Sequence, residues 1–287
     1  MSTKDLIRKI RKIEIKTRSL SNHIFSGGYH TAFKGKGMIF SEVKDYILGD
    51  DIRNIDWNVT ARFNSPYVKT FEEERETTVM LLIDISNSNI FGSKKQLKKD
   101  LITEVSAVLA FSAIQNNDKI GVVFFSDKIE KYIPPKKGKK HILRIIHELV
   151  SLKPKNKKTD IKEAVNFFNS INKKRSICFI ISDFIDKDYI ESISTSNKKH
   201  DVICIKVQDY LEKKLPKIGL LSIIDPETGK RGIINSNKIK TKDKKLLNLK
   251  LTKKGIDIIE LMTNESYIKK LDNFFKKRSR KKWKKNI

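Results

Sequence analysis

The chain has little cysteine, glycine and proline, and it has no long apolar run. Its 287 residues include 2 cysteines, 12 glycines and 6 prolines. Cys178 and Cys204 lie inside apolar, strand-like stretches and belong to no Cys-x-x-Cys or Cys/His cluster, so we expect buried, reduced thiols rather than zinc or redox chemistry. No stretch approaches the ~20 apolar residues of a membrane span, and the amino terminus lacks the apolar centre of a signal peptide. We therefore expect a soluble, cytoplasmic protein.

Common catalytic signatures are missing as well. The sequence contains no Gly-x-x-x-x-Gly-Lys-Ser/Thr phosphate loop, no Gly-x-Ser-x-Gly elbow and no His-Glu-x-x-His helix. His141 and His147 lie six residues apart in one predicted helix, which separates them around its axis. A metal-assisted phosphohydrolase would need a second metal or a general base that the sequence does not offer. These absences favour a protein that is not an enzyme.

Acidic residues are scarce relative to basic ones. The chain carries 61 Lys and Arg against 34 Asp and Glu, a formal net charge of +27. This excess leaves open an anionic partner, either nucleic acid or a membrane surface. The lysines are spread along the whole chain, however, which favours an ordinary solvated surface. The densest basic run covers residues 276–285 and includes Trp283, which can stack on a base or sit at a lipid interface.

The most informative motif follows an apolar run at residues 79–83. Asp84, Ser86 and Ser88 stand at alternate positions directly after it, and a helical pattern begins about ten residues later. This order places the three side chains at the carboxyl end of a buried parallel strand, where open α/β sheets bind ligands. A carboxylate and two hydroxyls suit a hard ion such as Mg²⁺ or Mn²⁺. The simpler alternative is that they only cap the turn.

Buried strands and helices alternate from residue 77 onward. Strands are predicted at 78–84, 119–125, 129–133, 176–181, 202–207 and 257–261, with helices at 96–116, 139–152, 160–171, 187–198, 243–252 and 265–277. The rhythm changes at 220–224 and 231–234, which flank an Asp-Pro-Glu-Thr-Gly turn and predict a β-hairpin insertion. The pattern predicts an α/β fold with a doubly wound, mostly parallel sheet. A helical and irregular extension precedes this predicted α/β domain. Within the extension, apolar residues spaced through positions 6–24 predict an amphipathic helix.

Two further segments complete a known site. Thr159 opens a helical pattern, and Asp183 follows the buried-strand run at 177–181. Together with Asp84, Ser86 and Ser88 they match the metal-ion-dependent adhesion site of the von Willebrand factor type A domain, which this part of the chain resembles. The resemblance implies that the three hydroxyls contact the ion, that Asp84 and Asp183 hold it largely through waters, and that an acid of a partner protein takes the remaining position. Lys157 and Lys158 depart from the family, which often has glycine before the threonine.

The segment Gly-Asp-Asp-Ile-Arg-Asn-Ile-Asp-Trp at residues 49–57 is the second strong motif. With Ala61-Arg62, the Glu-rich run at 72–76 and the Asp-Pro-Glu-Thr-Gly turn, it resembles the DUF58 family of bacterial and archaeal proteins, and the likeness covers nearly the whole chain. Physically, its carboxylates and guanidinium groups can form charge-assisted pairs, and we expect Ile55 and Trp57 to anchor it against the core. We weigh structural bracing above direct contact with a partner.

These observations divide the chain into an extension at 1–76, a von Willebrand factor A-like domain at 77–277 and a basic tail at 278–287. We expect a non-enzymatic, metal-dependent adaptor that binds a partner protein. The DUF58 resemblance implies that it works with a MoxR-type AAA+ ATPase in assembling or remodelling a target. The alternative is a basic protein that binds nucleic acid or a membrane surface, whose metal site is structural or relic.

Overall fold

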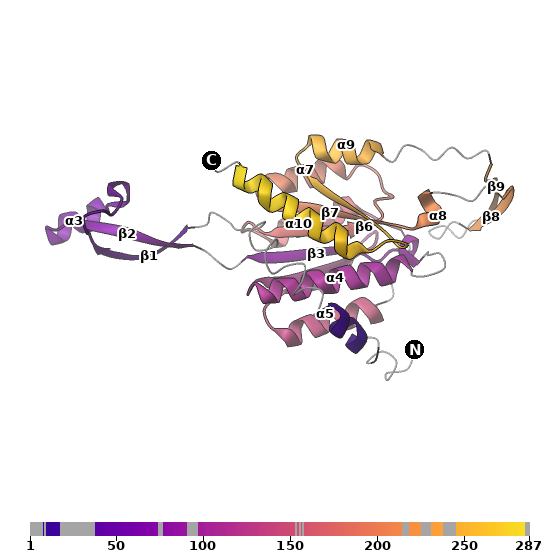
Figure 1. Cartoon of the computed structure of the whole chain (residues 1–287), viewed down its shortest axis with the longest axis horizontal. Helices are drawn as coiled ribbons and strands as arrows, with labels where there is room; N and C mark the ends of the chain where they lie inside the picture. The colour runs from indigo at the N-terminus through magenta and orange to yellow at the C-terminus, as the bar shows by residue number, and fades with distance from the viewer. Residues whose placement is uncertain are drawn as a thin grey trace. The chain divides into compact units, whose positions relative to one another are not determined.

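The computed structural model describes residues 8, 10–17, 38–73, 77–90, 97–152, 154, 156, 158–213, 218–224, 231–237 and 245–284. The chain divides into two compact units, Lys34–Thr77 and a larger unit formed by Met1–Phe33 and Thr78–Ile287 (Figure 1). We refer to the first as the β1–β2 unit and to the second as the main unit. Among the described residues, no helix has the length and apolar character to cross a membrane.

A six-stranded sheet forms the centre of the main unit. Its strands lie in the order β10-β7-β6-β3-β4-β5, and every neighbouring pair is parallel except β4 and β5. The strands are β3 (Thr78–Asp84), β4 (Lys119–Phe125), β5 (Ile129–Lys136), β6 (Ile177–Ser182), β7 (Asp201–Gln208) and β10 (Asp257–Met262). This confirms the predicted doubly wound, mostly parallel sheet.

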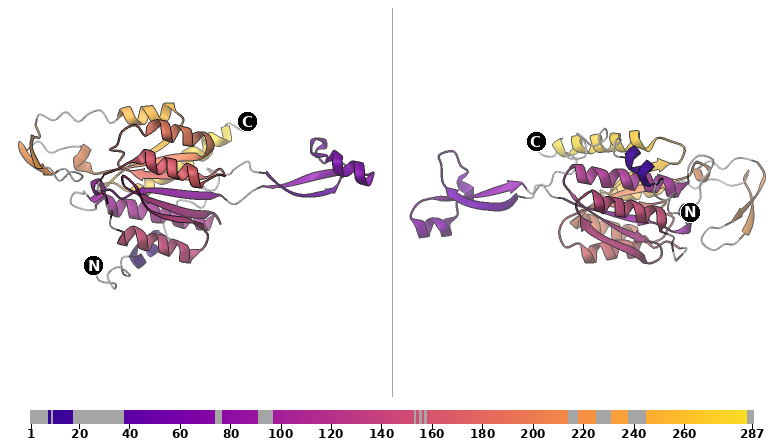
Figure 2. Two further views of the ribbon diagram at one scale, coloured as in Figure 1. Left: turned by 180° about the vertical axis from the view of Figure 1, so that it is seen from behind. Right: turned by 90° about the horizontal axis from the view of Figure 1, so that it is seen from below.

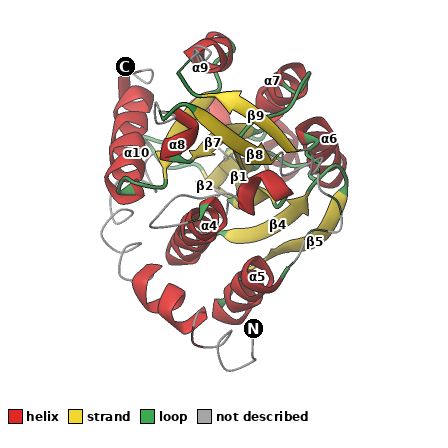
Figure 3. Cartoon of the chain, turned by 90° about the vertical axis from the view of Figure 1, so that its right-hand side faces the viewer, coloured by secondary structure: helices red, strands yellow, loops and turns green. Residues whose placement is uncertain are grey.

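Helices cover both faces of the sheet, as Figure 3 shows, and explain why the central strands are apolar on both sides. On one face lie α4 (Lys98–Gln115), α5 (Lys139–Ser151) and α10 (Tyr267–Lys284); on the other lie α6 (Ile161–Ile171), α7 (Ile190–Lys199) and α9 (Lys245–Lys253). Each face has its own cluster of buried residues, one built around α4 and the other around α6. The sheet is therefore the middle of three layers (Figure 2).

The edge strand β5 continues past its predicted end at residue 133 and includes Pro134 and Pro135. Proline removes a backbone donor, so it is tolerated where one side of a strand has no neighbour in the sheet. The neighbouring β4 carries Gly121, where an added Cβ would lie 2.7 Å from Met80 Sδ and 2.9 Å from the backbone nitrogen of Pro135. Glycine at this position lets the two strands and the Met80 side chain pack closely.

The last helix runs beyond its predicted end at residue 277 and reaches Lys284. The reason is that Arg278 faces the body of the protein, where its guanidinium pairs with Asp201 on β7 and Asp257 on β10. These contacts fix the helix one turn past Phe275, which is fully buried. Trp283 lies on the final turn, and its side chain falls outside the described residues.

The main unit also contains the predicted hairpin and an amino-terminal helix. The predicted hairpin is present as β8 (Leu220–Ile224) and β9 (Arg231–Asn235), which pair antiparallel, while its turn at 225–230 falls outside the described residues. A helix over residues 10–17 buries Ile13 in the core, and Glu14 pairs with Lys139 at 2.7 Å. Ile10 is partly buried and packs against the same core, whereas Leu6, Leu20 and Ile24 fall outside the described residues. Cys178 and Cys204 are free and buried, as expected.

The β1–β2 unit contains an antiparallel pair, β1 (Met38–Asp45) and β2 (Tyr67–Glu73), joined through the 3-10 helix η1 (Ile52–Asn54) and α3 (Trp57–Phe63). Asp51 and Asp56 cap these two helices. The Arg53 guanidinium donates from Nε to Asp51 Oδ1 at 3.1 Å and from Nη2 to Asp51 Oδ2 at 3.0 Å. The predicted charge pairs are therefore present. The prediction that Trp57 is anchored against the core is wrong. Trp57 is the first residue of α3, and its side chain is 70% exposed.

Candidate metal centre

The candidate site lies where β3 ends, next to the ends of β4 and β6. Asp84 is the last residue of β3, and the 3-10 helix η2 (Asn87–Ile90) follows it. The chain leaves β3 toward β4 on one side, whereas β6 flanks it on the other, so the site occupies a switch point of the sheet. All three strands are parallel, which brings their carboxyl ends to one edge.

Hydrogen bonds hold Asp84, Ser86 and Ser88 close together. Asp84 Oδ1 accepts from the backbone nitrogen of Ser86 at 2.9 Å, and the hydroxyls of Ser86 and Ser88 are 3.0 Å apart. The side chain of Asn89 donates to the backbone oxygen of Asp84 at 3.1 Å and closes the turn. All four residues are buried. The turn therefore gathers a carboxylate and two hydroxyls with hardly any exposure to bulk water.

Asp183 approaches from the neighbouring strand. Ser182 ends β6 and donates its hydroxyl to Asp84 Oδ2 at 2.6 Å, which ties the two strand ends together. Asp183 Oδ1 accepts from the backbone nitrogen of Ile185 at 3.1 Å. Between them Phe184 has φ of 57°, a left-handed conformation that is unfavourable for a bulky side chain. The strained turn is held by these contacts, and it keeps Asp183 buried beside Asp84.

Thr159 sits at the start of α6 and differs from the other four residues. Its Oγ1 is buried, and no hydrogen-bond partner for it occurs within the described ranges. The segment is nevertheless fixed: the backbone nitrogen of Asp160 donates to Ser126 at 2.8 Å, and that of Ile161 donates to Asp186 at 2.8 Å. A buried hydroxyl without a hydrogen-bond partner costs folding free energy, and a ligand that contacts this oxygen would remove that cost. Lys158 is exposed, and Lys157 falls outside the described residues.

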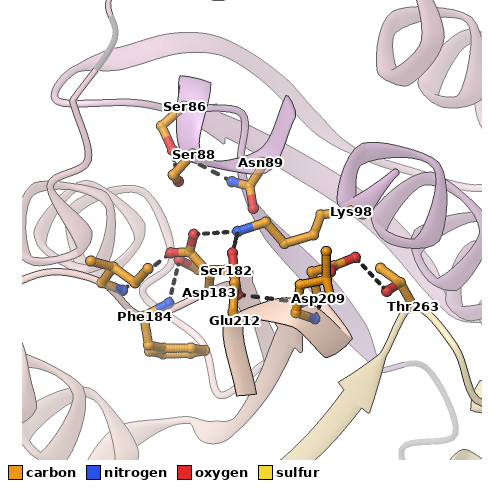
Figure 4. Close-up of polar contacts among 12 residues, drawn as sticks. Ser86, Ser88, Asn89, Lys98, Ser182, Asp183, Phe184, Asp209, Glu212 and Thr263 are labelled. Atoms are coloured by element: carbon orange, nitrogen blue, oxygen red, sulfur yellow. Dashed lines mark hydrogen bonds and ion pairs between the residues drawn. The ribbon is translucent and has the colours of Figure 1, made fainter. Parts of the chain in front are cut away.

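A lysine that the sequence analysis did not identify completes the cluster. Lys98, at the first turn of α4, is fully buried, and its Nζ lies 3.0 Å from Asp183 Oδ2 and 2.7 Å from Glu212 Oε1 (Figure 4). Glu212 belongs to α8 (Tyr210–Lys213), which follows β7. Burial alone would lower the pKa of Lys98, but the charges and hydrogen bonds of Asp183 and Glu212 outweigh it and raise the pKa. The ammonium therefore stays charged.

The electrostatics of the cluster suit a cation. Burial, with a further contribution from the charge of Asp183, raises the pKa of Asp84 to about 6. Two buried carboxylates repel each other unless positive charge lies between them. Lys98 supplies that charge on one side of Asp183, but it makes no hydrogen bond to Asp84 among the described contacts. A divalent ion near Asp84 would relieve the remaining repulsion.

The residue types at the site fit Mg²⁺ or Mn²⁺. No group of three or more His, Cys, Asp or Glu side chains suited to a metal occurs in the described part of the chain, so an ion here would depend on hydroxyl oxygens. Asp84, Ser86, Ser88 and Asp183 lie together, and Thr159 has an unsatisfied buried oxygen. Hard oxygen donors of this kind match small divalent ions.

Comparison with known proteins finds a matching family profile and related sequences. A family profile described as "Protein of unknown function DUF58" matches residues 42–246. Uncharacterized proteins of Mycobacterium bovis and Mycobacterium tuberculosis are 25% identical over 227 residues, which covers 78% of this chain and 72% of each relative.

Solved structures are similar to this chain at low sequence identity. The BatB protein of Bacteroides thetaiotaomicron is similar with a TM-score of 0.50 and 16% identity, over 71% of this chain and 99% of that one. A von Willebrand factor type A protein of Catenulispora acidiphila is similar with a TM-score of 0.37 and 12% identity, over 74% of this chain and 43% of that one.

Proposed function

The chain belongs to the DUF58 family and has a von Willebrand factor A-like fold, and from that premise we propose that it is a non-enzymatic, metal-dependent protein-interaction module. The observation that carries the proposal is the buried group of oxygens at the end of β3, together with the unsatisfied hydroxyl of Thr159. We propose Asp84, Ser86, Ser88, Thr159 and Asp183 as the residues that would hold Mg²⁺ or Mn²⁺. A bound ion would supply a Lewis-acidic position that an acidic side chain of a partner can occupy.

The chain's own residues would prepare this position. Ser182 orients the Asp84 carboxylate, and the left-handed turn at Phe184 holds Asp183 beside it. Lys98 neutralises part of the charge on Asp183, so the cluster would hold together with or without a bound ion. The Ser182 hydroxyl, which donates to Asp84, is fully buried and also accepts from the backbone nitrogen of Phe184, so we assign it to positioning, which supports a binding role over a catalytic one.

Family resemblance suggests the wider role. We propose that the protein works as an adaptor for a MoxR-type AAA+ ATPase, in which the ATPase assembles or remodels a target. The proposal is supported by the DUF58 membership alone, so the partner must be tested directly.

The test has two steps. Isothermal titration of the metal-free protein with Mg²⁺, Mn²⁺ and Ca²⁺ should give a single binding site that is lost in a Ser86→Ala/Ser88→Ala variant. Both serines are small, so this variant should fold like the wild type, as circular dichroism can verify. Capture from native lysate should then retain an AAA+ ATPase with Mg²⁺ and release it with chelator. Wild-type protein that binds no divalent ion would refute the proposal.

Positive charge supports a second candidate, binding to nucleic acid or to an anionic membrane. The chain carries +27, and its last helix is basic through Lys284. Arg278 and Lys276 are engaged in ion pairs within the protein, which reduces the charge available on that helix. Phosphate binding would weaken steeply as salt rises and would be insensitive to chelator, so a salt titration separates it from an ion-bridged contact.

A further inference from the structure

The β1–β2 unit presents large apolar side chains to solvent. Leu48 is 95% exposed and Trp57 is 70% exposed. Three other exposed apolar side chains lie within residues 47–63, namely Ile47, Ile52 and Phe63. Single exposed apolar residues are ordinary, but so many in one short stretch of a small unit indicate a surface that a partner covers. Trp57 is the side chain best suited to anchor such a contact, and Leu48 is the most exposed of the five.

The charge of this unit differs from that of the rest of the chain. Residues 34–77 contain 7 basic and 9 acidic residues, a net charge of −2. The remaining residues contain 54 basic and 25 acidic residues, a net charge of +29. A slightly acidic, apolar surface complements a strongly basic one. The main unit of another copy of this chain carries a net positive charge of this kind.

The main unit has exposed apolar residues beside the candidate metal centre. Leu97 directly precedes Lys98, and Tyr210 directly follows Asp209, whose carboxylate caps the start of α8. Ile185 is exposed while its backbone nitrogen donates to Asp183. Exposed apolar and aromatic side chains are the kind that fill the core of protein interfaces. This edge of the sheet can therefore receive an apolar partner as well as an acidic one.

We propose that the β1–β2 unit of a second copy docks on this edge, with Leu48 and Trp57 covering the apolar residues and Asp45 offering its carboxylate to the metal. The inference rests on the proposed metal site and names the partner of that site. Asp45 is exposed at the end of β1, near Leu48, and forms no ion pair among the described residues. Asp51 is less suited because Arg53 already engages its carboxylate.

The contact joins two different surfaces, so it is heterologous. After one such contact, one copy of the pair still has a free metal centre and the other still has a free β1–β2 unit. The assembly therefore extends into a ring or a chain unless one surface is blocked. This property gives a sharp test with two variants, one defective in the β1–β2 surface and the other in the metal centre. Mixed together, they can form a single productive contact, between the intact metal centre of the first and the intact β1–β2 unit of the second.

Sedimentation velocity of the full-length protein over a series of concentrations provides that test. With Mg²⁺, the wild type should form species larger than a dimer, and chelator should return it to a monomer. A Leu48→Ser/Trp57→Ser variant and a Ser86→Ala/Ser88→Ala variant should each weaken self-association by roughly 30-fold, as expected for loss of hot-spot contacts. An equimolar mixture of the two variants should form a dimer and nothing larger. An Asp45→Asn variant should lose the dependence on Mg²⁺.

The outcomes distinguish this inference from the proposed function. If the wild type binds Mg²⁺ by titration calorimetry but stays monomeric at every concentration, the second copy is not the partner, whereas the metal-dependent module stands. If no divalent ion binds, both fail. A mixture of the two variants that stays monomeric while the wild type assembles also overturns the inference, since the contact then joins other surfaces.

Discussion

Replacement of Lys98 by methionine should destabilise the metal-free protein strongly. The ammonium bridges Asp183 and Glu212 at 3.0 and 2.7 Å, and the side chains of Lys98 and Asp183 are each 1% exposed. Breaking a buried ion pair by removing one partner costs about 3–5 kcal/mol, because the other charge is left buried without compensation. Glu212 keeps 20% of its side chain exposed and can turn toward water. We therefore expect the lower end, about 3 kcal/mol.

Urea unfolding in chelator, followed by circular dichroism, measures this loss. Lys99→Met is the matched control: it removes the adjacent lysine, whose Nζ donates to the backbone oxygen of Leu152 at 3.1 Å in a partly buried position. That neutral-acceptor contact should be worth about 1 kcal/mol. Adding Glu212→Gln to Lys98→Met should recover part of the loss, since one of the two uncompensated carboxylates is then neutral.

Magnesium gives the experiment a second readout. An ion at the candidate centre would restore positive charge near Asp183, so Mg²⁺ should raise the free energy of unfolding of Lys98→Met more than that of the wild type. The reasoning would be refuted if Lys98→Met were no less stable than Lys99→Met in chelator. Equal stabilisation of Lys98→Met and wild type by Mg²⁺ would show that the ammonium and the ion do not share Asp183.

Three further predictions concern pH and packing. In chelator, the raised pKa of Asp84 should make its contribution to stability present near pH 4 and lost as pH rises through about 6, and Asp84→Asn should remove this slope in urea titrations. Burial lowers the pKa of His200 to about 4, so stability should fall as pH drops from 6.5 toward 4, and His200→Phe should flatten that fall; an unchanged slope would contradict it. Gly121→Ala should cost about 1–3 kcal/mol, because the new methyl group meets Met80; a variant as stable as wild type would show that the strands adjust freely.

Local patterns were sufficient to predict the sheet and the turn of the candidate site. Short apolar runs that contain β-branched residues, such as residues 79–83, are typical of buried strands, and a polar turn directly after such a strand lies at its carboxyl end. Ser182 and Asp183 follow the same rule at the end of β6. Thr159 could be assigned to the site only from a family resemblance. Nothing in the sequence around Thr159 links it to Asp84, which lies 75 positions earlier.

Lys98 and Trp57 show what local patterns cannot give. Lys98 stands in a basic, polar stretch that predicts a solvated helix start, and only the packing of α8 brings Glu212 beside it. Trp57 is apolar and aromatic, so composition predicts burial, yet the small β1–β2 unit has too little core to cover it. In both cases the environment comes from the tertiary arrangement rather than from neighbouring residues.

The two consecutive prolines on β5 have a consequence for assembly. An open sheet exposes backbone donors and acceptors at its edge and can recruit a strand from another molecule, the first step toward aggregation. The backbone nitrogen of Pro135 faces Gly121 on β4, and consecutive backbone nitrogens of a strand point to opposite sides, so Pro134 is the residue that withdraws a donor from the open edge and acts as a gatekeeper against strand addition. Association of two copies through their sheets along β5 is therefore disfavoured, even at high concentration. Contacts between side chains then determine which surfaces of this chain associate.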